Sequence, residues 1–237
     1  GSDDLRRKRD VLQGDRRADL PDLPAVQKIR EGREQNKMSE RHTILQGIEK
    51  DIQNILYRYM KTQSFTYTER EKEAEQFLVD HLSKIPYFRE HPEHFGTWSI
   101  PGDPFDRAVC YGMVKGEGDD TIVFVHHNDV VEIEDFKLLK SYAFSPDELA
   151  EELMKIRDSL PKDAKKDLEE GTFLFGRGGA DMKGGGSIQL ALLERYSRME
   201  HFRGNVIVIA VPDEENLSAG MRAGVELLAE LKDRYKL

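Results

Sequence analysis

The sequence has one cysteine, no long apolar run and no excess of positive charge. A lone Cys110 cannot form an intramolecular disulfide, so we expect a reducing, cytoplasmic setting. The sequence contains no run of about 18 apolar residues, so we expect no membrane-spanning helix. Residues 1–10 also lack the apolar stretch of a secretory signal. The formal net charge of -9 argues against a nucleic-acid-binding protein that depends on broad electrostatic attraction.

The 237 residues are enough for one large domain or two small ones. Residues 1–37 differ from the rest, because they hold ten Lys/Arg and eight Asp/Glu with few apolar side chains. We interpret them as a leader or extension that is disordered or loosely helical. The alternative is a helical arm that packs on a partner. Residues 38–237 are expected to form the folded domain.

Hydrophobic periodicity within residues 38–237 predicts strands that alternate with helices. The predicted helices are 41–62, with a second at 67–84 and later ones at 187–198 and 219–235, and the predicted strands are 98–100, 108–114, 121–125, 172–175 and 206–211. A charged, helix-prone insertion is expected at about 135–170, with Pro146 and Pro161 near helix starts. The alternation predicts an α/β fold with a largely parallel central sheet.

The first group of candidate metal ligands follows the strand predicted over 121–125. His127 can offer a neutral imidazole nitrogen to a metal, and Asp129 can hold the other ring nitrogen. His126 should point to the opposite face of the strand, so it is not a candidate ligand. Taken alone, this group could also be a polar turn.

Two further groups follow later predicted strands. Asp181 lies in the glycine-rich stretch 176–186, and Asp213-Glu214-Glu215 follows strand 206–211. A dinucleotide-binding loop would need glycine at position 181, where a carboxylate would repel a pyrophosphate. Taken alone, either group could be a solvated turn. Because ligands bind beyond the carboxyl ends of strands in α/β sheets, the three groups together are typical of a two-metal hydrolase.

Three motifs in these groups carry a resemblance to a known family. They are His127-Asn128-Asp129-Val130-Val131, Gly176-Arg177-Gly178-Gly179-Ala180-Asp181-Met182-Lys183-Gly184 and Asp213-Glu214-Glu215. The chain resembles the co-catalytic zinc peptidases and deacylases, which include aminoacylase, acetylornithine deacetylase and succinyl-diaminopimelate desuccinylase. Residues 142–149 and 174–178 are most similar to the branch of the arginine-utilisation protein RocB. The resemblance implies a three-layer α/β/α catalytic domain over residues 41–235.

The resemblance also implies the roles of the site residues. His127 would ligate one zinc ion, Glu215 a second, and Asp181 would bridge the two, with cobalt or manganese as substitute metals. Glu214 would be the general base that takes a proton from the bridging water, and Asp129 would orient His127. The substrate would be a small amide or peptide in arginine utilisation, without a nucleic-acid or membrane partner, and the full-length enzyme could be a homodimer.

The sequence departs from the family pattern after Glu215. The family takes a further carboxylate ligand and a final histidine ligand from later segments, and no histidine follows His201 here. We therefore expect the chain to be the N-terminal part of such an enzyme and to hydrolyse little by itself. The alternative is a non-catalytic relic, or a subunit that works only when another chain completes it.

Overall fold

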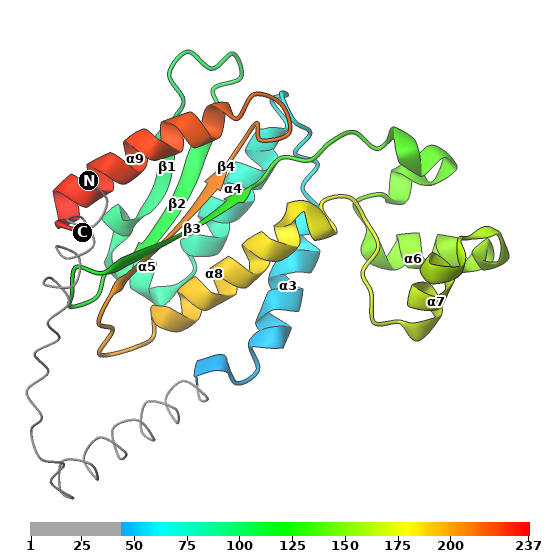
Figure 1. Cartoon of the computed structure of the whole chain (residues 1–237), viewed down its shortest axis with the longest axis horizontal. Coiled ribbons are helices and arrows are strands. Elements are labelled where there is room, and N and C mark those ends of the chain that lie inside the picture. The colour runs from blue at the N-terminus through cyan, green and yellow to red at the C-terminus, as the bar shows by residue number, and fades with distance from the viewer. Residues whose placement is uncertain (1–43) are drawn as a thin grey trace, which may run out of the picture. The chain divides into compact units, whose positions relative to one another are not determined.

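The computed structural model describes residues 44–237, which form one α/β unit (Figure 1). The leader predicted over residues 1–37, and the first residues of the helix predicted over 41–62, lie outside the described residues. Within residues 44–237, no helix is both long enough and apolar enough to cross a membrane.

A mixed sheet lies at the centre of this unit. In residues 44–237 it contains four strands, in the order β1-β2-β4-β3. The strands are β1 (Phe95–Ser99), β2 (Ala108–Val114), β3 (Thr121–His127) and β4 (Asn205–Val211). β3 and β4 run parallel, whereas β1 and β2, and also β2 and β4, are antiparallel. The α/β fold is thus confirmed.

The expectation of a largely parallel sheet is wrong for this part of the chain. Short connections join β1 to β2 and β2 to β3, and parallel neighbours need a crossover of about a dozen residues or more. Only the long segment between β3 and β4 allows such a crossover, which passes through α8 (Gly184–Tyr196). The carboxyl ends of the neighbouring strands β3 and β4 therefore lie side by side at the same edge of the sheet.

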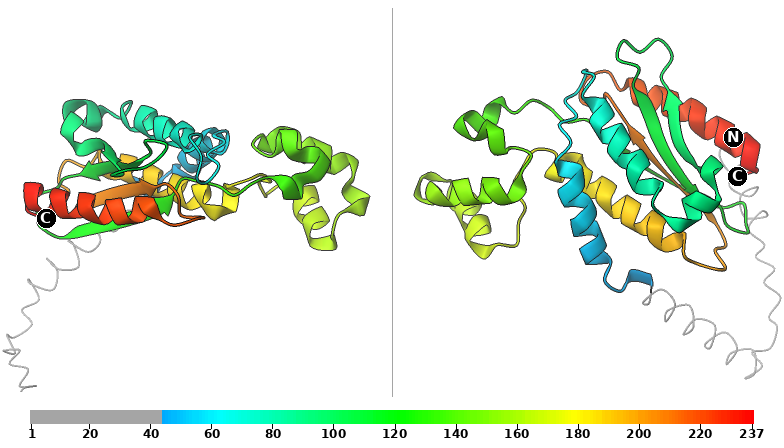
Figure 2. Two further views of the ribbon diagram at one scale, coloured as in Figure 1. Left: turned by 90° about the horizontal axis from the view of Figure 1, so that it is seen from above. Right: turned by 180° about the vertical axis from the view of Figure 1, so that it is seen from behind.

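Helices cover both faces of the sheet, which gives the predicted three layers (Figure 2). One face packs against α3 (Ile48–Met60), α4 (Glu71–Leu82) and α8. The other face packs against α9 (Ala219–Tyr235), whose Ala223, Leu227 and Leu231 contact β2 and β4. Every residue of β4 is buried, as its continuous β-branched run predicts.

The predicted helical insertion forms a group of short helices beyond the ends of the strands (Figure 1). They are η2 (Glu134–Tyr142), α6 (Pro146–Lys155), η3 (Arg157–Ser159) and α7 (Lys162–Glu170). Pro146 begins α6 as predicted, since its fixed φ suits the first helical turn. A small core cluster that includes Val130, Ala143 and Phe144 anchors the insertion.

The remaining elements lie between α4 and β1, and at the start of α8. They are α5 (Pro86–Glu90), η1 (Pro92–His94) and η4 (Gly179–Lys183). The strand predicted over 172–175 is wrong, because that segment is irregular. Phe173 and Leu174 are exposed, and no described strand pairs with them. An apolar run needs a hydrogen-bonded neighbour to become a strand, and the sequence pattern alone does not supply one.

Candidate metal centre

Three predicted ligands come together at the carboxyl edge of the parallel pair. His127 is the last residue of β3 and pairs in register with Val211, the last residue of β4. Asp181 belongs to η4, and Glu215 follows β4 by a few residues. Potential ligand atoms of His127, Asp181 and Glu215 lie within 4.8 Å of one another. The predicted convergence of these side chains is confirmed.

The His127 ring is held with one nitrogen toward the carboxylates. Its Nδ1 lies 3.1 Å from the backbone carbonyl oxygen of Asp129, and its Nε2 lies 2.9 Å from Oδ1 of Asp181. An Nδ1–H that donates to a carbonyl leaves Nε2 as the metal-binding atom. Burial favours the neutral ring, but hydrogen bonds with Asp129 and Asp181 outweigh it and raise the pKa of His127 to about 9. A metal at Nε2 would therefore displace a proton.

Asp129 holds the acidic turn after β4 as well as the histidine. Its side chain is fully buried, and Oδ1 lies 3.4 Å from Nδ1 of His127. Its two carboxylate oxygens accept hydrogen bonds from the backbone N–H groups of Glu214 and Glu215, each at 3.1 Å. Burial alone would raise the pKa of Asp129, but its hydrogen bonds from His127 and these amides outweigh burial and lower it. Asp129 thus stays ionised at the junction of β3 and β4.

Glu214 and Glu215 lie beside His127 and close to the other carboxylates of the site. Oε2 of Glu214 is 3.9 Å from Nε2 of His127, and about half of the Glu214 side chain is exposed. Burial raises the pKa of Glu215; the His127 charge opposes the rise, and the neighbouring carboxylates, Asp181 first, add to it. Crowded carboxylates repel one another, and a bound cation removes that cost.

The donor set fits a divalent metal. One imidazole nitrogen and two carboxylates are ligand types of catalytic zinc sites, and the carbonyl that fixes His127 is the usual outer partner of a metal-binding histidine. An open cavity of about 330 Å³ adjoins the cluster and is lined by Val131, Gly176, Arg177, Gly178, Ala180, Asp181 and Glu215. A small ligand could therefore reach Asp181 and Glu215 directly.

The glycine-rich loop that carries Asp181 depends on a close approach at Gly178. This residue has φ of 75°, and a Cβ added to it would lie 2.8 Å from Cγ1 of Val130. Below the loop, Lys183 is fully buried and its Nζ donates to the carbonyl oxygen and Oγ1 of Thr62, at 2.7 and 2.8 Å. Burial lowers the pKa of Lys183 to about 7. The sequence motif contained Lys183, but nothing in it indicated this contact.

The buried Arg107 anchors the acidic turn from the side away from the metal cluster. Its Nη1 lies 2.6 Å from Oε1 of Glu71 and 3.0 Å from Oδ1 of Asp213. Asp103 binds Nη2 of the same guanidinium at 2.6 Å. Oε2 of Glu71 also accepts the backbone N–H of Asp213 at 2.8 Å. Asp213 therefore faces the arginine, and only Glu214 and Glu215 of the acidic triplet face His127.

Sequence reasoning missed this arginine cluster. Glu71, the first residue of α4, accepts the backbone N–H of Tyr67 and pairs with Arg107. The partners of Arg107 lie up to 106 residues away from it in the chain. No local sequence pattern connects these residues. The available signal was that Arg107 and Asp213 directly flank apolar strands, where a charged side chain is buried only when it is paired.

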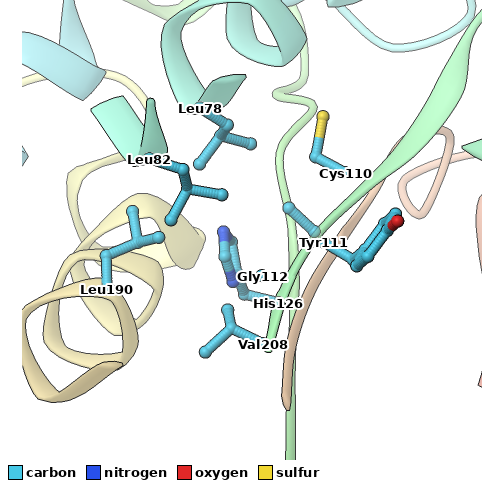
Figure 3. A pocket seen from close by; sticks show the side chains of 9 residues that line it. Leu78, Leu82, Cys110, Tyr111, Gly112, His126, Leu190 and Val208 are labelled. Atoms are coloured by element: carbon cyan, nitrogen blue, oxygen red, sulfur yellow. The ribbon is translucent and has the colours of Figure 1, made fainter. Parts of the chain in front are cut away.

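His126 points into the core, on the opposite face of β3 from His127, as predicted. Figure 3 shows its ring between α4, α8 and the sheet, beside Leu82 and Leu190. Its Nδ1 lies 2.8 Å from Oε1 of Gln189, and its Nε2 lies 3.3 Å from the hydroxyl of Tyr59. Burial lowers the pKa of His126 to about 4, although the bond with Gln189 opposes the shift. This histidine is a neutral core residue.

Comparison with known proteins relates part of the chain to a family of peptidases. Residues 157–237 match the family described as Peptidase family M20/M25/M40. The chain is 37% identical over 164 residues to protein RocB of Bacillus subtilis (strain 168), a match that covers 68% of this chain and 29% of RocB. It is 35% identical over 186 residues to the uncharacterized protein YqjN of the same organism, covering 77% of this chain and 33% of YqjN. The chain spans about a third of the length of these curated relatives.

The fold is also similar to that of a solved peptidase. The dipeptidase Dug1p of Saccharomyces cerevisiae matches with a TM-score of 0.54 and 14% identity, over 82% of this chain and 38% of Dug1p. At this identity the likeness shows the fold alone. The resemblance drawn from the three sequence motifs is confirmed by the family match and by the two relatives.

Proposed function

Because residues 157–237 match the peptidase family M20/M25/M40, we propose that the chain supplies the metal site of a hydrolase of amide or peptide bonds. The observation that carries the proposal is the convergence of His127, Asp181 and Glu215 within 4.8 Å. They gather where a 330 Å³ cavity gives a small substrate access.

His127, Asp181 and Glu215 would hold the metal. Zinc is the proposed ion, and two ions are proposed for the complete enzyme, with cobalt or manganese as substitutes. Bound metal supplies an acidified water and polarises the carbonyl of the substrate. Nε2 of His127 is already directed at Asp181, which suits Asp181 as the carboxylate shared between two ions.

Glu214 is proposed as the general base. Its carboxylate is 3.9 Å from Nε2 of His127, so it can reach a water held between His127 and Asp181. A general base in that position would take a proton from the attacking water and give it to the leaving amine. Asp129 is a positioning residue, because it binds the backbone N–H groups of Glu214 and Glu215 and contacts His127.

The finer proposals concern substrate and setting. Small N-acyl amino acids or dipeptides are the proposed substrates, and arginine utilisation is proposed from the similarity to RocB. We propose a cytoplasmic enzyme that requires neither nucleic acid nor a membrane, with the homodimer as its proposed assembly.

The second candidate function is a site that binds metal but does not hydrolyse substrate by itself. Within residues 44–237, the cluster gathers three ligand side chains. Shared between two ions, they give His127 and Asp181 to one ion, and Asp181 and Glu215 to the other. A catalytic zinc usually has about three protein ligands and a water. On this ligand count the chain alone should bind zinc loosely and hydrolyse little, and a further chain or segment would complete it.

Zinc binding and hydrolysis by the purified chain test both candidates. The assay offers N-acetyl amino acids and dipeptides with excess zinc to the wild type, to Glu214→Gln and to Glu226→Gln, an exposed glutamate of α9. We expect the zinc held at this cluster to be lost in His127→Ala, with little turnover. Full turnover that Glu214→Gln abolishes and Glu226→Gln preserves would support the complete enzyme and reject the second candidate. Absence of both zinc binding and turnover would overturn the proposed function.

A further inference from the structure

A second group of ligand-type side chains lies at the other end of the sheet. Glu93 and His94 belong to the short helix η1 and His91 directly precedes it, just before β1. β1 is antiparallel to β2, and β2 is antiparallel to β4, so β1 runs in the same direction as β4. The start of β1 is therefore at the edge opposite to the carboxyl ends of β3 and β4. This group is separate from the site at His127.

The three side chains are close enough to share one ion. Nδ1 of His91 is 3.7 Å from Oε1 of Glu93, and Nε2 of His94 is 3.5 Å from the same oxygen. The potential ligand atoms all lie within 4.8 Å of one another. Tetrahedral zinc with ligands at about 2.0 Å needs ligand atoms about 3.3 Å apart. Small turns of His91 and Glu93, whose side chains are 44% and 52% exposed, would close the remaining gap.

The least mobile of the three, His94, is held in the orientation that a ligand needs. Its side chain is only 8% exposed. Its Nδ1 lies 2.8 Å from the hydroxyl of Tyr87, which also accepts the backbone N–H of Lys115 at 2.9 Å. With Nδ1 bonded to Tyr87, Nε2 is the ring nitrogen that faces Glu93. A polar group on the far nitrogen is the usual partner of a metal-binding histidine.

The backbone that carries the ligands is also fixed. The carbonyl oxygen of Glu93 accepts a hydrogen bond from the hydroxyl of Tyr235, in α9, at 3.3 Å. The ring of Tyr235 packs edge-on against His94, with centroids 5.1 Å apart. The stretch from His91 to His94 is thereby held against the last turn of α9, and a ligand set on a fixed backbone needs little reorganisation to bind.

We propose that His91, Glu93 and His94 form a second metal site, which takes zinc or a similar divalent transition-metal ion. Two imidazoles and one carboxylate select zinc, copper or nickel over magnesium and calcium, which prefer oxygen ligands. The exposed side of the site leaves room for water or for a fourth ligand. Because Tyr235 contacts both Glu93 and His94, a bound ion stabilises the junction of η1 with α9. This inference does not depend on the proposed function.

Zinc equilibrium dialysis on the full chain tests the proposal. The background is His127→Ala with Asp181→Ala, which removes two ligands of the first site. We expect this variant to retain one tight zinc per chain, and zinc to raise its melting temperature. Adding His91→Ala and Glu93→Gln should abolish both effects. His201→Ala is the matched control, because His201 also lies beside a carboxylate, with its Nδ1 3.0 Å from Glu117, and it should change neither.

A further variant distinguishes a preorganised zinc site from nonspecific zinc binding to exposed side chains. Tyr87→Phe removes no ligand, yet the loss of an outer partner should weaken zinc binding about 10- to 100-fold. If the background variant does not fold, the wild type should lose one zinc per chain when His91 and Glu93 are replaced. Zinc binding that is absent from the background variant, or that His91→Ala with Glu93→Gln leaves unchanged, would overturn the proposal.

Discussion

The carboxylate of Asp129 accepts the backbone N–H of Glu214 at 3.1 Å, which joins the end of β3 to the acidic turn after β4. The other carboxylate oxygen accepts the backbone N–H of Glu215 at the same distance. The position of the proposed base and of one proposed ligand is thus set by main-chain contacts to a buried carboxylate. Their own side chains remain free to bind metal or water.

Replacing Asp129 with asparagine should loosen this turn. The amide NH₂ would face a backbone N–H where a carboxylate oxygen now accepts it, which leaves a buried donor unpaired. We expect a loss of about 1–3 kcal/mol in the free energy of unfolding and zinc binding that is about 10- to 100-fold weaker. Urea unfolding and zinc titration measure the two effects. Asp119→Asn, at an exposed position, is the control, and an equal effect of both variants would contradict the role of Asp129.

Arg107→Met should destabilise the fold strongly. Methionine replaces the aliphatic part of the arginine with an apolar side chain of similar length. Glu71, Asp103 and Asp213 then lack the cation that they share. Removing one partner of a buried ion pair costs about 3–5 kcal/mol. Guanidinium unfolding should show this loss, and adding Glu71→Gln to Arg107→Met should recover part of it. A loss below about 1 kcal/mol would show that water enters the cluster and screens its charges.

His126 should make the stability of the protein depend on pH. Burial lowers its pKa from an ordinary 6.5 to about 4, so between these values the unfolded chain binds a proton that the folded chain does not. The free energy of unfolding should therefore fall as the pH drops from 6.5 to 4, by about 3 kcal/mol in total. Thermal or urea unfolding across this range should show a shallower decline in His126→Gln than in the wild type. An unchanged slope would contradict the assignment.

Gly178→Ala should lower the free energy of unfolding of the protein more than Gly171→Ala does. Both glycines have positive φ, 75° at Gly178 and 66° at Gly171, so both alanines have the same left-handed strain of about 1–2 kcal/mol. A Cβ at Gly171 meets nothing within 4 Å, whereas a Cβ at Gly178 meets Val130 at 2.8 Å. The difference in the free energy of unfolding isolates this steric contact. Equal losses would mean that the loop relaxes away from Val130 at no cost.

The sequence indicated that His127 and Glu215 lie close together because each follows a strand whose apolar pattern is strong. Parallel pairing of β3 with β4 brings their ends together, and the strand ranges 108–114 and 206–211 lie within or match the observed strands. His126 and His127 were also separated correctly, since side chains alternate along a strand. Periodicity therefore sufficed for β3 and β4, which lead to His127 and Glu215, but not for the segment before Asp181.

The rest depends on contacts that no local pattern contains. Arg107 acquires its partners from α4 and from the turn after β4, and the ammonium of Lys183 meets Thr62 across 121 residues of sequence. The antiparallel pairing of β2 with β4 likewise depends on the order of the strands in the sheet. Hydrophobic periodicity predicts strands but not their order. Residues 172–175 have a strand-like composition but lack a neighbouring strand.

The location of zinc in a crystal of this chain tests the account most directly. Anomalous diffraction at the zinc edge, on crystals grown with zinc, measures where the metal lies. The account predicts that Nε2 of His127 and carboxylate oxygens of Asp181 and Glu215 each lie about 2.0–2.2 Å from a zinc peak, and that crystals of His127→Ala have no peak beside residue 127. The proposed metal centre would be contradicted if zinc in the wild type bound only at other positions and contacted none of these three side chains.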